Sequence, residues 1–140
     1  RPDATAETFK DGWVVTGDLA RLDEEGFLYL VDRAKDMLIR GGENIYCIEV
    51  ENALYDHPAV MDAVVVGVPD EKWGQCVAAV IQARPGQSLA TEELVTFCKT
   101  KVAGYKVPRQ YHEVDSILRH PSGKPDYRWA KSIATGEARA

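Results

Sequence analysis

The residue with the clearest capacity for chemistry is Lys124, which lies in a loop of sequence PSGKPDY at 121–127. A lysine beside a glycine on a loop can place its ammonium on a phosphate or a carboxylate. One such donor, held where negative charge develops, accelerates a reaction by about 10²- to 10³-fold. The residue types alone leave a second interpretation open, which is a solvated lysine on an exposed loop.

Two residues far upstream have side chains suited to a nucleotide. Asp18 ends the sequence TGD at 16–18, and its two carboxylate oxygens can accept hydrogen bonds from both hydroxyls of a ribose. Arg33 has a planar fork of donors that suits ribose and phosphate oxygens. Each also has a structural interpretation. Asp18 can bond its own backbone in a turn, and Arg33 can pair on the surface with Asp32 or Asp36.

Three further positions concern the backbone. Lys35 lies two residues after Arg33, where a polar, exposed residue can absorb a large change of dihedral angles as a hinge. The alternative is an ordinary solvated lysine. Gly41 and Gly42 permit positive φ and a close approach of the backbone, which serves either a tight turn or a ligand.

Composition restricts the classes of protein. The 140 residues are 45% hydrophobic and 28% charged, which is typical of a globular chain with room for one core. The net charge of −5 argues against nucleic acid as the main partner. No apolar run reaches the ~20 residues of a membrane span, so we expect no transmembrane segment. A local group of basic residues is either a binding face or a solvated surface: Lys99, Lys101, Lys106, Arg109 and Arg119.

The cysteines and histidines indicate no metal site. Cys47, Cys76 and Cys98 are odd in number, widely spaced and in apolar surroundings. We therefore expect buried thiols in a reducing, cytoplasmic compartment rather than disulfides. The three histidines show no ligand spacing.

Hydrophobic periodicity predicts an α+β fold, with a small, mostly antiparallel sheet flanked by helices and preceded by a β-hairpin. The hairpin is expected from strands 13–15 and 27–31 around a turn at 23–26. Residues 60–68 are apolar on both faces, which predicts a central strand covered by helices. The remaining expected strands are 37–39, 76–83 and 110–117, and the expected helices are 48–56, one N-capped by Thr91 that ends near Gly104, and 126–133.

Four motifs, in this order and at these separations, resemble the C-terminal part of the adenylate-forming enzymes. They are TGD at 16–18, DRAK at 32–35, GGENIY at 41–46 and PSGK at 121–124. This superfamily contains acyl-CoA synthetases, luciferases and peptide-synthetase adenylation domains, and the chain is most similar to fatty-acyl-CoA synthetases. The resemblance extends over about 12–131.

The resemblance implies a role for each candidate residue. Lys124 would be the adenylation catalyst, while Asp18 would hold the ribose of ATP and AMP together with Arg33. Lys35 would be the hinge between two domains. The remaining two positions, Gly41 and Gly42, would line the channel for the pantetheine arm of CoA.

The resemblance also implies how the chain is divided. Residues 1–34 would be the end of an N-terminal adenylation domain, 35–133 the mobile C-terminal domain, and 134–140 a flexible tail. The chain starts without Met, so we expect a piece of a longer protein that is nearly inactive alone. Its first thirty or so residues would pack on the missing domain, and in the isolated chain we expect them to be either mobile or docked onto a second copy.

The predicted function is that of a fatty-acid–CoA ligase, which forms acyl-AMP from a fatty acid and ATP and then a thioester with CoA. Mg²⁺ would be bound mainly by the missing domain. An aryl or short-chain acid–CoA ligase and a carrier-protein adenylation domain remain alternatives, because acyl specificity is set in the missing domain. From another class, a non-catalytic protein-binding module is the alternative.

Overall fold

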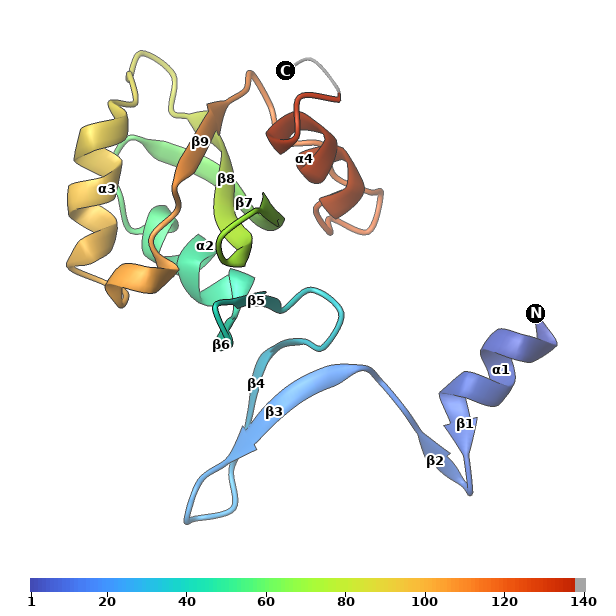
Figure 1. Cartoon of the computed structure of the whole chain (residues 1–140). Helices are drawn as coiled ribbons and strands as arrows, with labels where there is room; N and C mark the ends of the chain where they lie inside the picture. Colours follow the sequence, from blue (N-terminus) through green and yellow to red (C-terminus); the bar gives the residue numbers. More distant parts are fainter. Residues whose placement is uncertain (138–140) are drawn as a thin grey trace. The chain divides into compact units, whose positions relative to one another are not determined.

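A computed structural model describes residues 1–137 and divides the chain into two compact units, which meet in sequence between Lys35 and Asp36. The first unit, Arg1–Lys35, starts with helix α1 (Pro2–Thr8). A small pair of strands follows, β1 (Phe9–Lys10) and β2 (Trp13–Val14), and then the longer hairpin of β3 (Asp18–Leu22) and β4 (Leu28–Arg33) (Figure 1).

The predicted hairpin is confirmed in its turn and second strand but was wrong in its first strand. The segment 13–15 is rich in β-forming residues, yet it pairs backwards with 9–10. The partner of β4 is β3, in which Asp18 and Arg21 interrupt the apolar residues. Asp23 closes the turn between them, since its Oδ1 accepts hydrogen bonds from the amides of Glu25 and Phe27. The choice of strand partner therefore does not follow the β-propensity of the segment 13–15.

The second unit contains a three-stranded sheet in the order β7 (Val60–Asp70), β8 (Gly74–Ala83), β9 (Gln110–Glu113). β7 and β8 form an antiparallel hairpin, whereas β9 runs parallel to β8. A parallel neighbour requires a crossover connection, and helix α3 (Thr91–Lys99) provides it. β8, rather than the expected 60–68, is therefore the central strand.

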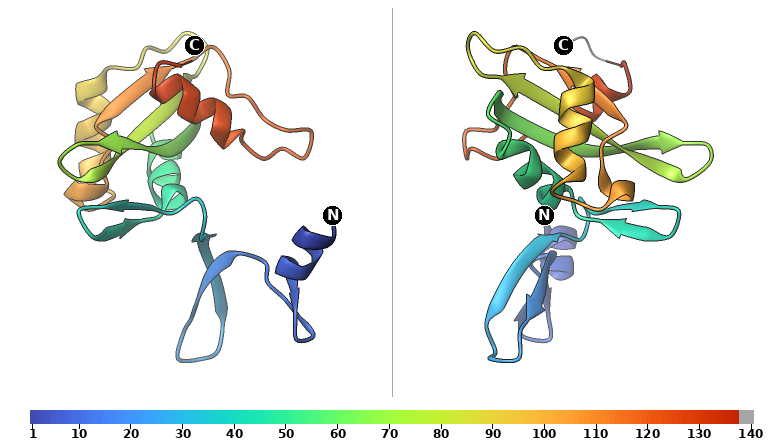
Figure 2. Two further views of the ribbon diagram at one scale, coloured as in Figure 1. Left: turned by 45° about the vertical axis from the view of Figure 1, so that its right-hand side comes forward. Right: turned by 90° about the vertical axis from the view of Figure 1, so that its left-hand side faces the viewer.

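Helices cover both faces of this sheet (Figures 1 and 2). Helix α2 (Cys47–Tyr55) and α3 lie on one face, and helix α4 (Tyr127–Ala134) lies on the other. Successive residues of β7 alternate between them: Ala63 and Val65 pack with α2 and α3, while Val64 and Val66 pack with α4. The predicted burial of both faces of 60–68 follows from this alternation.

The second unit also contains a separate two-stranded sheet and a short 3₁₀ helix. Strands β5 (Leu38–Arg40) and β6 (Glu43–Ile45) form a hairpin, and a short 3₁₀ helix spans Gly104–Lys106. The expected α+β class is confirmed, as is the burial of all three cysteines as free thiols.

Several expected boundaries were wrong. Helix α3 ends at Lys99 rather than near Gly104. Thr91 is the first residue of α3, and the N-cap is Ala90, which forms no side-chain capping bond. The last strand ends at Glu113, short of the predicted 117. Ala134 belongs to α4 and is buried, so it is not part of a tail; residues 138–140 of the predicted tail lie outside the described residues. Among residues 1–137, every helix is too short or too polar to span a membrane.

Candidate functional site

The loop that carries Lys124 joins the end of the sheet to α4 and closes on itself. The amide of His120 donates to the carbonyl of Lys124 at 2.9 Å, and the amide of Gly123 donates to the carbonyl of His120 at 2.8 Å. Gly123 has φ +81°, a backbone conformation that favours glycine. Lys124 is exposed directly after this glycine, so the fold presents its ammonium to solvent on a tight turn.

Helix α4 fixes the far end of the loop. Asp126 is its N-cap, and its Oδ1 accepts hydrogen bonds from the amides of Arg128 and Trp129, both at 3.0 Å. The amide of Asp126 itself donates to the carbonyl of Leu118 at 2.9 Å. The helix predicted at 126–133 is confirmed, with Asp126 as its cap rather than its first residue.

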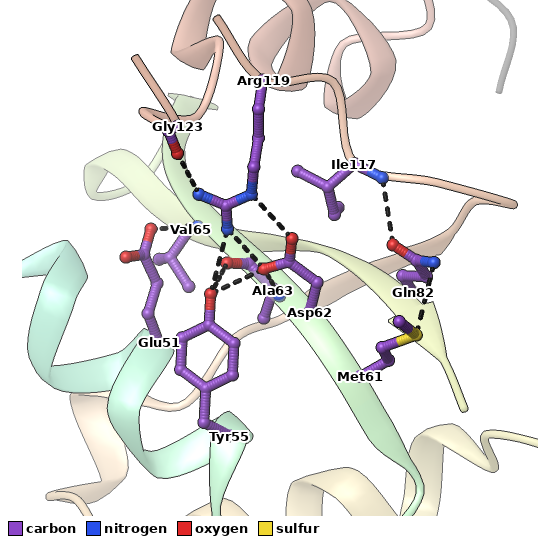
Figure 3. Close-up of polar contacts among 10 residues, drawn as sticks. All are labelled: Glu51, Tyr55, Met61, Asp62, Ala63, Val65, Gln82, Ile117, Arg119 and Gly123. Carbon is purple, nitrogen blue, oxygen red and sulfur yellow. Dashed lines mark hydrogen bonds and ion pairs between the residues drawn. The ribbon is translucent and has the colours of Figure 1, made fainter. Parts of the chain in front are cut away.

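Arg119 fixes the near end of the loop. Its Nε and Nη2 donate to the two carboxylate oxygens of Asp62 at 2.9 and 2.6 Å, and its Nη1 donates to the carbonyl of Gly123 at 2.7 Å (Figure 3). Tyr55 completes the group, since its hydroxyl donates to Asp62 Oδ1 at 2.6 Å. In the sequence, Arg119 is only one of five nearby basic residues, because Asp62 and Tyr55 are more than 50 residues away from it.

The pKa values of this group follow from burial and pairing. Partial burial alone would raise the pKa of the Asp62 carboxyl, but hydrogen bonds from Arg119 and Tyr55 outweigh it and lower that pKa. Burial and the bond to Asp62 raise the pKa of Tyr55 to about 12. Asp62 is therefore an anion, and Tyr55 a neutral donor, near neutral pH.

The first unit brings Asp18 and Arg33 together. They are register partners across β3 and β4, and Arg33 Nε lies 3.2 Å from Asp18 Oδ1. The guanidinium of Arg33 also donates to the carbonyl of Thr16 at 3.2 Å. Its partner is thus neither of the neighbouring aspartates that the sequence offered. Both side chains remain partly exposed, so a ribose could contact the carboxylate and the guanidinium at once.

The turn before Asp18 does not use its carboxylate. The amide of Asp18 donates to the hydroxyl of Thr16 at 3.2 Å, and Gly17 adopts φ +77°.

Lys35 is the exposed last residue of the first unit and lies in a turn. A change of dihedral angles there would leave the hydrogen bonds of β4 and β5 intact, because Lys35 belongs to neither strand.

Gly41 and Gly42 form the two-residue turn of the β5–β6 hairpin, with φ +58° and +87°. The amide of Gly41 donates to the carbonyl of Trp73 at 3.0 Å. A Cβ on Gly41 would lie 2.8 Å from the Trp73 ring, whereas a Cβ on Gly42 would meet no atom within 4 Å among the described residues. Gly41 therefore packs directly against Trp73, whereas Gly42 has open space where a side chain would lie.

The five basic residues do not form one free face. Lys101 pairs with Asp56 at 2.9 Å, and Lys106 pairs with Glu49 at 2.7 Å. Since Arg119 pairs with Asp62, three of the five cations are already matched by carboxylates. In residues 1–137, no group of three or more His, Cys, Asp or Glu side chains could hold a metal ion.

Comparison with known proteins decides the family. A model of the AMP-binding enzyme C-terminal domain matches residues 49–124, which is more than half of the chain. The chain belongs to this family. This domain family is the one that the four motifs indicated, the C-terminal domain of adenylate-forming enzymes.

Curated relatives match a longer part of this AMP-binding C-terminal domain chain than the family model does. The chain is 49% identical over 123 residues to the fatty acid–[acyl-carrier-protein] ligase ScoC of Streptomyces coeruleorubidus, which covers 88% of the chain and 24% of the relative. It is 50% identical over 131 residues to a medium/long-chain-fatty-acid–CoA/3-oxocholest-4-en-26-oate–CoA ligase of Mycobacterium tuberculosis, which covers 91% and 24%. The chain thus spans about a quarter of the length of these curated relatives.

A solved structure shows the same fold. The o-succinylbenzoate CoA synthetase (MenE) of Bacillus subtilis, in complex with the acyl-adenylate intermediate OSB-AMP, superposes with a TM-score of 0.88 at 42% identity. The match covers 94% of this chain and 27% of that one.

Proposed function

We propose that this chain is the C-terminal part of an ATP-dependent fatty-acid–CoA ligase. In the first half-reaction, a carboxylate oxygen of the acid attacks the α-phosphate of ATP and pyrophosphate leaves, which gives acyl-AMP. In the second, the thiol of CoA attacks the acyl carbon and AMP leaves. The observation that carries the proposal is the exposed Lys124 on its closed glycine turn, in a chain of the AMP-binding enzyme family.

Lys124 is assigned to the first half-reaction. Its ammonium would stabilise the negative charge that develops as the bond to pyrophosphate breaks. Asp18 and Arg33 would hold the ribose of ATP, and their 3.2 Å pairing supports a shared role. We assign Mg²⁺ mainly to the remainder of the parent enzyme, as the resemblance to the adenylate-forming enzymes implies.

The Gly41–Gly42 turn is assigned to the second half-reaction, where it would line the path of the pantetheine arm. This turn contacts Trp73, which lies just beyond the C-terminal end of β7. The Lys124 loop is linked through Arg119 to Asp62, which lies near the N-terminal end of β7. Asp62 and Asp70 are eight residue steps apart along the strand, which corresponds to about 25 Å. Two sites so far apart on one unit support a rotation about Lys35 between the half-reactions.

The first unit is proposed to be the end of the N-terminal domain. Several of its large apolar side chains are exposed, with Trp13 at 77%, Leu30 at 72% and Leu22 at 67%. Apolar patches of this kind mark an interface. The rest of the parent enzyme would cover them, and a second copy of the chain would do so in its absence.

Lys124→Ala in the parent enzyme tests the proposal. Adenylation, followed as pyrophosphate release, should fall about 10²-fold or more. Thioester formation from supplied acyl-AMP should persist, because that step has no pyrophosphate to leave. Lys131→Ala, on the exposed side of α4, serves as a matched control. An equal loss in both half-reactions would contradict the assignment.

The acid and the acceptor need their own measurement. Two relatives are named as fatty-acid ligases and support a fatty acid, whereas the 42% identical o-succinylbenzoate synthetase supports an aryl acid. Adenylation rates of the parent on fatty acids of graded length and on aryl acids should favour the fatty acids. CoA and an acyl carrier protein, offered in parallel, should show CoA as the preferred acceptor.

A further inference from the structure

The guanidinium of Arg119 connects the Lys124 loop to the sheet. Three of its nitrogens are used: two on the carboxylate of Asp62 and one on the carbonyl of Gly123, the residue directly before Lys124. Nη2 also lies 3.3 Å from the Tyr55 hydroxyl. In the described part of the chain, the other hydrogen bonds of residues 119–125 stay within 118–126. Arg119 is thus the polar link from this loop to β7 and α2.

The acceptor side of this link is held firmly. Asp62 accepts hydrogen bonds from Nε and Nη2 of Arg119, from the Tyr55 hydroxyl at 2.6 Å and from the amide of Ala63 at 2.8 Å. Its side chain is only 17% exposed. A two-pronged, charge-assisted pair in a partly buried place holds geometry better than an exposed ion pair. The pair of Lys101 and Asp56, with exposures of 42% and 59%, is of the second kind.

We propose that Arg119 is a positioning residue for Lys124. By bridging the carbonyl of Gly123 to the carboxylate of Asp62, it fixes the peptide that immediately precedes the lysine and so fixes the point from which the ammonium reaches. This inference rests on the proposed function of Lys124 in adenylation. A displacement of about 1 Å at a reacting group can cost about 10²-fold in rate, so loss of the link should slow adenylation without affecting thioester formation.

The first test measures the loop directly in the parent enzyme. Arg119→Gln removes the charge and the two-pronged contact, while Lys101→Gln removes the cation of an exposed ion pair elsewhere on the unit. Hydrogen exchange of a peptide that covers 118–126 should become faster in Arg119→Gln and stay unchanged in Lys101→Gln. Unchanged exchange in both variants would overturn the link itself.

The second test measures each half-reaction. Arg119→Gln should lower the adenylation rate constant about 10- to 100-fold, with KM for ATP and acid little changed and with thioester formation from acyl-AMP preserved. The adenylation rate constant of Arg119→Lys should lie between those of the unchanged enzyme and Arg119→Gln. An ammonium can keep one contact with Asp62 but cannot bridge to Gly123 in the same fork geometry. A general folding defect would instead slow both half-reactions together, and that outcome overturns the positioning role.

A double-variant cycle then identifies the route of the effect. If Arg119 acts through Lys124, adding Arg119→Gln to Lys124→Ala should change adenylation by less than about twofold. A full additional loss in the Lys124→Ala background would overturn the inference while leaving the proposed function in place. If Lys124→Ala leaves adenylation unchanged, both the proposed function and the inference fail.

Discussion

At the scale of single residues, the two glycines of the β5–β6 turn illustrate how neighbours can differ. Both have positive φ, so each disfavours a side chain for conformational reasons. Only Gly41 is also packed, because its missing Cβ leaves room for the Trp73 ring. The sequence predicted the conformational requirement but not the packing, since Trp73 is 32 residues away and nothing near Gly41 indicates it.

The difference between these glycines predicts a difference in stability. Gly41→Ala and Gly42→Ala both introduce positive-φ strain of about 1 kcal/mol. Gly41→Ala should lose about 1–3 kcal/mol more, because its Cβ would lie 2.8 Å from Trp73. Urea unfolding of both variants at one pH measures the difference in the free energy of unfolding. Equal losses would mean that the ring moves aside without cost.

At the scale of elements, helix α4 depends on a single side chain at its start. Asp126 accepts hydrogen bonds from two amides that the helix itself leaves without partners. The helix also buries Ala130 and Ile133 against the sheet. The cap therefore holds both a core element and one end of the Lys124 loop.

Replacing the cap should have a graded effect. Asp126→Ala should lower the free energy of unfolding by about 1 kcal/mol, because two amide donors lose their acceptor. Asp126→Asn keeps an acceptor oxygen and should lose much less. Urea unfolding of the two variants makes the comparison. If both substitutions had the same effect, charge rather than capping would be responsible.

Elements with strong local signals were predictable, and elements set by distant pairing were not. The alternation of valines in 63–68 predicted burial on both faces, and the structure confirms it. The place of β8 at the centre of the sheet depends on the parallel addition of β9, which no local pattern encodes. The same holds at the site: the glycine turn before Lys124 was visible in the sequence, whereas the link from Arg119 to Asp62 spans 57 residues.

At the scale of the whole molecule, the chain combines two units with different sets of candidate residues. Asp18 and Arg33 belong to the first, and Lys124, Gly41 and Gly42 belong to the second, with Lys35 at the boundary in sequence. Within the second unit, the Lys124 loop and the glycine turn are tied to opposite ends of β7. We thus propose that the second unit serves adenylation from one end of β7 and thioester formation from the other.

That division is tested most directly by single-turnover rates of both half-reactions in two variants of the parent enzyme, Lys124→Ala and Gly42→Leu. We expect a crossed result. Lys124→Ala should lose adenylation by about 10²-fold and keep thioester formation, and Gly42→Leu should do the reverse. Gly42→Ala controls for strain, because it shares the positive φ without the bulk. Parallel losses of both half-reactions in the two variants would contradict the assignment of separate sites.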